Sequence, residues 1–110
     1  MRRRHNSLVV TQLEEAIMNA VYEEARYGLE IIEMISEASN GSFQINFSSL
    51  YPTLGKLTKR GFLKSVQVQE DPEKRGNRLK KYYALTPLGI TSLEESERLI
   101  SILRNWNSQH

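Results

Sequence analysis

A strand–turn–strand pattern in the second half of the chain limits the fold more than any other feature of the sequence. Val66 and Val68 alternate with glutamines within residues 62–68, and residues 79–86 (LKKYYALT) form a second stretch that is rich in aromatic residues. The segment between them, residues 70–78 (EDPEKRGNR), consists of turn-forming and charged residues. Because turn residues such as Gly-Asn join paired strands, we predict a long hairpin with a charged tip.

Two stretches with helical spacing of apolar residues open the chain. Thr11 and Glu14 have the spacing of a capping box, and they begin a helix that we expect to end near Glu24. A second helix is expected over residues 28–39. The following Asn40-Gly41 pair would end it, because both residues tolerate the left-handed conformation.

A third helix is predicted from Ser49, as the N-cap, to Arg60. Pro52 then falls in its first turn, where a missing N–H costs little. Just before this helix, residues 43–47 (FQINF) alternate between apolar and polar and predict a short strand. After the hairpin, Thr86 is the expected N-cap of a last helix with Pro at its first position.

The order helix, helix, short strand, helix, hairpin, helix describes an α+β, mainly helical fold. We identify it as a winged helix-turn-helix with one extra C-terminal helix, and 110 residues suffice for one such domain. Residues 1–10 are expected to form a flexible basic arm. Residues 11–86 would form the DNA-binding domain, and residues 87–110 a dimerisation helix.

Charge is unevenly distributed along the chain. Residues 11–40 carry seven Glu and one Arg, whereas residues 41–86 carry nine Lys or Arg and three acidic residues. This asymmetry indicates a polyanionic partner that meets one part of the fold; solvated surfaces are the alternative. The glutamates are expected to face solvent, away from that partner: Glu14, Glu15, Glu23, Glu24, Glu30, Glu33 and Glu37.

Several kinds of active site are excluded by composition. The chain has no Cys, and its two histidines, His5 and His110, lie near its ends. Disulfides, thiolate metal sites and internal histidine catalysis are therefore ruled out. We expect no enzyme, catalytic residue, metal or cofactor. No apolar run approaches the length of a membrane span, so we expect a cytoplasmic, nucleoid-associated protein without a membrane partner.

Candidate DNA contacts lie on the third helix and on the hairpin. In helix-turn-helix proteins the second helix of the pair enters the major groove, and its outward face here carries hydroxyl and basic side chains. The candidates on the helix are Ser49, Tyr51, Pro52, Thr53, Lys56, Lys59 and Arg60, and those on the hairpin are Lys74, Arg75, Asn77, Arg78 and Lys80. Each candidate has an alternative without DNA contact: the third helix is an ordinary amphipathic surface helix, the hairpin tip is merely solvated, and Tyr51 only packs against the protein. An N-terminal arm, residues 2–4, either reaches the minor groove or is an untethered tail.

The last helix has more apolar surface than one small domain can cover. The candidate dimerisation residues are Leu93, Leu99, Ile100, Ile102, Leu103 and Trp106. Pairing with a second copy would bury them and place two third helices about 34 Å apart on DNA. The alternative is a helix that folds back on its own domain.

Several motifs resemble one family. The stretches 27–31 (YGLEI), 49–54 (SLYPTL) and 81–89 (KYYALTPLG), together with Leu57 and Gly61, are similar to the PadR family of bacterial transcriptional regulators. The resemblance implies a winged-helix homodimer, usually a repressor, on a palindromic operator. Many members have a longer, multi-helix C-terminal region that makes the dimer and, in some, an effector pocket. This chain ends after one such helix, so a small-molecule effector is not expected. The chain also resembles a short member of the family that modifies the circadian clock, and this resemblance implies a clock role as a further expectation.

A winged helix can also serve as a protein-interaction module without DNA binding. The glutamate-rich first and second helices would then be the docking surface. Duplex binding at physiological salt discriminates the two functions.

Overall fold

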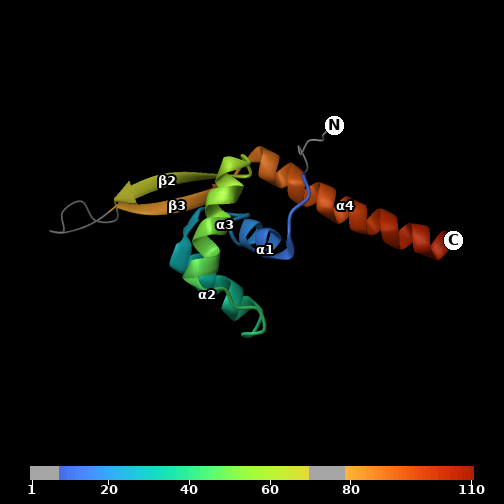
Figure 1. Ribbon diagram of the computed structural model, residues 1–110, viewed down its shortest axis with the longest axis horizontal. Helices are drawn as coiled ribbons and strands as arrows, with labels where there is room; N and C mark the ends of the chain where they lie inside the picture. Colours follow the sequence, from blue (N-terminus) through green and yellow to red (C-terminus); the bar gives the residue numbers. More distant parts are fainter. Residues whose placement is uncertain (1–7, 70–78) are drawn as a thin grey trace.

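The computed structural model describes residues 8–69 and 79–110, and it is a mainly helical winged-helix fold (Figure 1). In chain order its elements are α1 (Gln12–Ala20), β1 (Arg26–Tyr27), α2 (Gly28–Ala38), α3 (Phe47–Lys59), β2 (Leu63–Gln69), β3 (Leu79–Leu85) and α4 (Pro87–Gln109). The predicted fold class is confirmed, and both long strands lie where the alternating pattern placed them.

The sheet is antiparallel, with strand order β1-β3-β2. β3 pairs along its whole length with β2, from Leu63 opposite Leu85 to Gln69 opposite Leu79. Its other edge holds β1, where Tyr27 lies opposite Tyr82. The short strand predicted at residues 43–47 is therefore wrong. That alternation instead reflects a loop with one buried side chain, Ile45, followed by the first residue of α3.

α1 begins as predicted and ends four residues earlier than predicted. The Glu14 backbone N–H donates to the Thr11 hydroxyl at 3.1 Å, and the Glu14 carboxylate accepts from the Thr11 N–H, which completes the capping box. At the other end, the Arg26 Nε donates to the Ala20 carbonyl at 2.9 Å. This bond occupies a carbonyl that a continuing helix would use, and the chain turns into β1.

α3 begins earlier than predicted because Asn46, rather than Ser49, is its N-cap. The Asn46 side-chain oxygen accepts from the Ser49 N–H at 2.9 Å. Pro52 consequently lies inside the helix instead of in its first turn. The helix continues to Lys59, and Gly61, with a φ of +83°, ends it as predicted.

One hydrophobic core joins the helices to the sheet. Its members are Ile17, Met18, Ala20, Val21, Ile31, Ile35, Ile45, Leu50, Leu54, Leu57, Phe62, Leu63, Tyr83 and Leu93. Leu8 and Val10 pack against this cluster, so the expected flexible arm is anchored from residue 8 onward. Residues 1–7 lie outside the described part of the chain.

α4 belongs to the core only at its start. Thr86 caps it as predicted, and its hydroxyl accepts from the Gly89 N–H at 3.0 Å. Gly89, Ser92 and Leu93 are buried, but from Glu97 onward every side chain is exposed. Figure 1 shows this distal part of α4 projecting from one side of the domain, while β2 and β3 project from the other.

Candidate nucleic-acid interface

α3 presents most of the predicted contact residues on one exposed surface. Ser49, Tyr51, Pro52, Lys56 and Lys59 are all exposed, and the leucines of the helix are buried beneath them. Both lysines lie toward the C-terminal end of the helix, where positive charge is also favourable to the helix itself. A hydroxyl, a phenol and two ammonium groups on one helix suit contacts with phosphates and base edges.

Thr53 does not share this surface. The prediction that it faces outward is wrong, because its side chain is only 8% exposed. Its hydroxyl donates to the Ser49 carbonyl at 2.9 Å, which is the usual way that a helical threonine satisfies its hydroxyl. Ser49 and Thr53 are four residues apart and were predicted to share one outward face. Ser49 lies on the exposed side of the border of the buried face, and Thr53 lies on the buried side.

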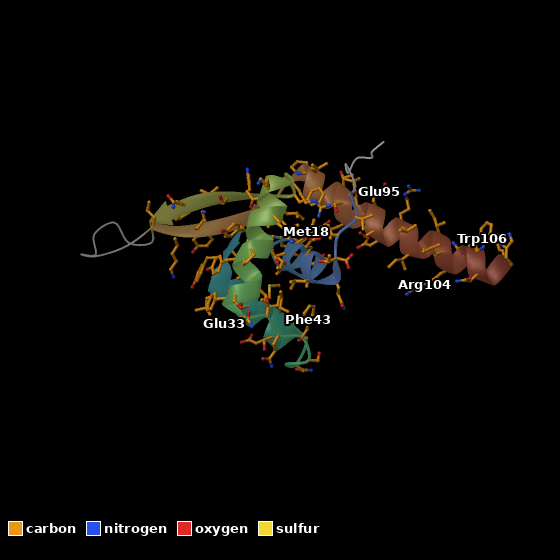
Figure 2. All side chains as sticks on the ribbon, viewed as in Figure 1. Met18, Glu33, Phe43, Glu95, Arg104 and Trp106 are labelled. Atoms are coloured by element: carbon orange, nitrogen blue, oxygen red, sulfur yellow. The ribbon has the colours of Figure 1, made fainter. Side chains whose placement is uncertain are left out.

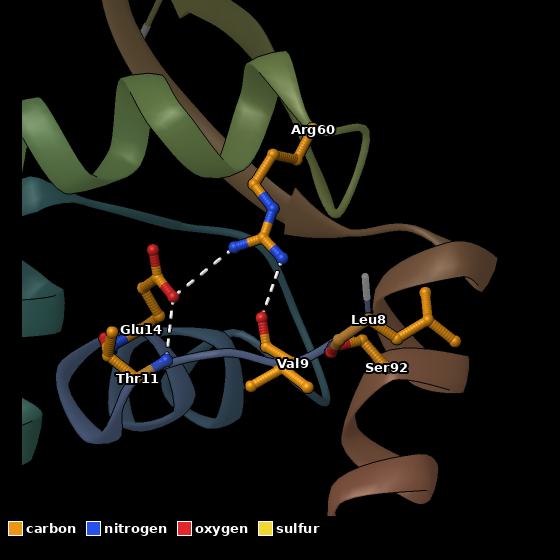
Figure 3. Close-up of polar contacts among 6 residues, drawn as sticks. All are labelled: Leu8, Val9, Thr11, Glu14, Arg60 and Ser92. Atoms are coloured by element: carbon orange, nitrogen blue, oxygen red, sulfur yellow. Dashed lines mark hydrogen bonds and ion pairs between the residues drawn. The ribbon is translucent and has the colours of Figure 1, made fainter. Parts of the chain in front are cut away.

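Arg60 also turns away from the exposed face, contrary to the prediction. Figure 3 shows its guanidinium directed toward α1 and the N-terminal segment. Nη1 lies 3.4 Å from the Glu14 carboxylate, Nη2 donates to the Val9 carbonyl at 2.7 Å, and the group lies over the Phe62 ring. Arg60 therefore ties the end of α3 to the rest of the domain.

Glu14 departs from its prediction for the same reason. It was expected to face solvent, yet it is 7% exposed and pairs with Arg60. The other six glutamates of α1, α2 and the turn between them are exposed or half-buried. Glu30 accepts a hydrogen bond from the Tyr27 N–H at the start of α2.

Aromatic side chains stand at the N-terminal end of α3. The Phe47 and Tyr51 rings stack with centroids 5.7 Å apart, and both are about half exposed. The Tyr51 ring lies against the backbone of Gly28, so a side chain at that glycine would displace it. Phe47 was missed as an exposed surface residue, because the alternation of residues 43–47 assigned it to a strand.

Tyr83 lies beside this cluster, on β3. Burial raises the pKa of its phenol above the ordinary value, and the neighbouring Tyr51 raises it further. The neutral phenol is thus the form that the folded chain favours.

On the hairpin, only the base of the predicted site is described. The Lys80 ammonium lies 3.9 Å above the Tyr27 ring, and that ring meets Tyr82 edge to face. Both contacts hold the strand that carries the lysine against β1. The remaining candidates, Lys74, Arg75, Asn77 and Arg78, lie outside the described residues.

The described residues form no candidate metal centre. Residues 8–69 and 79–110 bring no three His, Cys, Asp or Glu side chains together as metal ligands. In the same part of the chain, no helix is both long and apolar enough to span a membrane. What the geometry offers is an exposed helix surface with two lysines, supported by a packed hydrophobic core.

Comparison with known proteins places the chain in a family. A family profile described as "Transcriptional regulator PadR-like family" matches residues 17–95. A Lysinibacillus sphaericus protein named "Uncharacterized protein X" is 33% identical over 90 residues, which cover 82% of this chain and 79% of that protein.

Solved structures share the fold. A PadR-like transcription factor from Bacteroides fragilis superposes with a TM-score of 0.73 at 28% identity, covering 88% of this chain and 87% of the other. Bacillus subtilis PadR, solved in complex with operator DNA, superposes with a TM-score of 0.66 at 26% identity. That match covers 76% of this chain and 45% of the Bacillus subtilis chain.

Proposed function

The chain belongs to the PadR-like family of transcriptional regulators, and we propose that it is a repressor that binds a palindromic promoter element as a homodimer. DNA-binding transcriptional regulation, rather than catalysis, is the function of the family. We do not extend the proposal to circadian timing, because no described residue points to it.

The observation that carries the proposal is the exposed cationic face of α3. Lys56 and Lys59 project from a helix whose opposite side is sealed in the core, so the helix can enter a groove without unfolding the domain. Ser49 and Tyr51 lie on the same helix and supply hydroxyls for phosphates or bases. Together with the hairpin, residues 63–85, this helix forms the proposed DNA-binding surface.

Fluorescence anisotropy on a duplex selected from a random pool, and on a scrambled duplex, tests DNA binding. If each subunit neutralises about three or four phosphates, the logarithm of the binding constant falls with the logarithm of salt with a slope of about −6. Lys56→Ala is expected to change sequence preference as well as affinity. Arg75→Ala or Arg78→Ala is expected to weaken binding to all duplexes and to flatten the slope by about one per lost contact.

Two outcomes would reject DNA binding as the function. One is a salt-independent interaction, and the other is no duplex binding at physiological salt. The second outcome would favour the protein-interaction module, with the exposed glutamates of α1 and α2 as its surface. A palindrome in the selected duplexes would support two-fold symmetry, and a single half-site would contradict it.

Dimerisation is proposed from the distal part of α4. Leu99, Ile102, Leu103 and Trp106 fall on one side of the helix, and each is between 46% and 59% exposed in the single chain. A monomer rarely leaves so many large apolar side chains in one row uncovered. A second copy provides an equal row, and a two-fold axis brings the two into contact. Leu93 is excluded from this interface, because it is buried in the core of its own chain.

Sedimentation equilibrium tests the dimer. Leu103→Asp and Trp106→Asp are each expected to shift the protein toward the monomer mass, because they place a charge in an apolar contact. Ser101→Asp, on the opposite side of α4, is the matched control and is expected to leave the wild-type mass unchanged. If both substitutions in the apolar row also leave the mass unchanged, the interface lies elsewhere.

Repression requires a separate experiment. We propose that the bound dimer blocks polymerase sterically, at the nucleoid and without a small-molecule effector. Transcription in vitro from a promoter that contains the selected element is expected to fall as protein is added. A rise in transcript would identify an activator instead.

A further inference from the structure

One glycine of α3 has no explanation inside the protein. Among the described glycines, Gly41 and Gly61 adopt positive φ angles, and Gly28 and Gly89 lie so close to neighbouring atoms that a Cβ would clash. Gly55 differs from all four. It lies within α3 with helical geometry, and a Cβ built on it meets no atom within 4 Å beyond its chain neighbours and the backbone of its own helix.

This glycine weakens the helix that contains it. Glycine inside an exposed helix is less favourable than alanine, because it loses more backbone freedom on folding. Pro52 adds to the disadvantage, since it removes a donor from the same helix. Nothing in the described fold offsets the glycine. Its benefit must therefore come from something that contacts the folded protein.

Gly55 occupies the exposed face that we assign to DNA. Its neighbours one helical turn away are Tyr51 and Lys59, both exposed, and Lys56 follows it directly. Leu54, next to it in the chain, is completely buried and points to the other side. The glycine thus exposes bare backbone between cationic and aromatic side chains.

We propose that Gly55 is where the backbone of α3 approaches DNA most closely, and that the missing side chain allows the helix to enter the major groove fully. The inference rests on the proposed function. The major groove is about 12 Å wide, and a helix with its side chains is about 10–12 Å across. One added side chain on the groove-facing side therefore moves the helix outward and lengthens every contact to the base edges.

Three measurements on Gly55→Ala test this inference. Its melting temperature is expected to rise by about 2–6 °C, because alanine favours the helix. Its affinity for the duplex selected with wild-type protein is expected to fall by about 10- to 100-fold, the cost of overfilling a tight contact. Binding to a scrambled duplex at low salt is expected to fall less, because that mode depends on phosphate contacts. Gly55→Leu is expected to lose more affinity than Gly55→Ala.

Asn19→Ala is the matched control. Asn19 is exposed on α1, where its side chain bonds only the Glu15 carbonyl of the same helix among the contacts described. Alanine there is also expected to favour its helix, without any change in DNA affinity. This control separates a stability effect from an effect on the interface.

The outcomes are distinguishable. A stabilised Gly55→Ala protein that binds the selected duplex as tightly as wild type overturns the inference. A lower melting temperature also overturns it, since the glycine would then serve the fold. If wild-type protein binds no duplex, the proposed function fails first, and the inference fails with it.

Discussion

The body of the protein and the distal part of α4 differ in whether their apolar side chains are buried within the chain. The body, residues 8–96, buries Met18 and the leucines of α3 completely, whereas the distal part of α4, residues 97–109, leaves its large apolar side chains about half exposed. In Figure 2, Met18 lies among the helices of the body and Trp106 near the far end of α4. The body holds its own core, and the distal helix has none within its chain.

This difference separates two sources of stability. Burial in the body is intramolecular and independent of protein concentration. Any burial of the distal helix by a second copy depends on concentration, because association follows mass action. The same substitution, leucine to alanine, is therefore expected to have different consequences in the two regions.

The largest effect is expected from Leu54→Ala in the body. Leu54 is fully buried, so its loss is expected to lower the free energy of unfolding by about 2–5 kcal/mol. Leu103→Ala, in the distal helix, is expected to cost little in dilute protein and more as the protein is concentrated. Urea unfolding at two concentrations that differ about a hundredfold measures both. Equal, concentration-independent costs would show that the distal helix packs on its own body.

A smaller effect is expected at the N-terminal segment, which ties elements of the body together. Ser92, in the buried start of α4, donates to the Leu8 carbonyl at 2.7 Å, and Arg60 of α3 donates to the Val9 carbonyl (Figure 3). Arg60→Met is expected to lower the free energy of unfolding by about 1–2 kcal/mol, because the buried Glu14 carboxylate loses this partner.

Lys59→Met, the neighbouring exposed cation, is the control for Arg60→Met. It is expected to weaken DNA binding and to leave stability nearly unchanged. The two substitutions together distinguish a structural cation from a DNA-contacting one. If Arg60→Met is as stable as wild type and binds DNA poorly, Arg60 contacts DNA and does not stabilise the fold.

Elements of the body were predicted correctly where the signals of neighbouring residues, such as helix caps and strand alternation, agree with the tertiary packing. The capping box at Thr11, the Thr86-Pro87 helix start and the hairpin follow from neighbouring residues alone, and all are confirmed. β1 was missed because two residues carry no periodicity, and this strand exists only through its pairing with β3. Local pattern cannot show a partner that is more than fifty residues away.

The candidate site shows the same division. Exposure of Lys56 and Lys59 follows from helical spacing, and it was predicted. Arg60 was misassigned because its partners, Glu14 and Val9, come from the far end of the sequence. Thr53 was misassigned because the predicted stripe included a position at the border of the core. Helical spacing predicts which residues form the buried and the exposed face, but it does not resolve the residues at the border between them. Tertiary contacts decide which of these border side chains turn inward.

The smallest effect, on Tyr83, tests whether the two regions respond separately to pH. Burial and Tyr51 raise the pKa of this phenol in the folded chain, so the folded state holds its proton more tightly than the unfolded state. The stabilisation is complete below the ordinary pKa of 10 and is lost as the pH rises through the folded pKa. Tyr83→Phe is expected to reduce the alkaline loss of stability, and Tyr22→Phe, which removes an exposed phenol, is the control.

α4 contains no tyrosine, and Trp106 is the only tryptophan of the chain. Urea unfolding between pH 9 and 11 can be followed by far-UV circular dichroism, which reports the helices of the whole chain, and by Trp106 fluorescence, which reports the distal helix alone. If the body is lost first, part of the circular dichroism signal falls before the Trp106 fluorescence changes. A simultaneous loss in both signals would mean that the distal helix unfolds with the body as one cooperative unit.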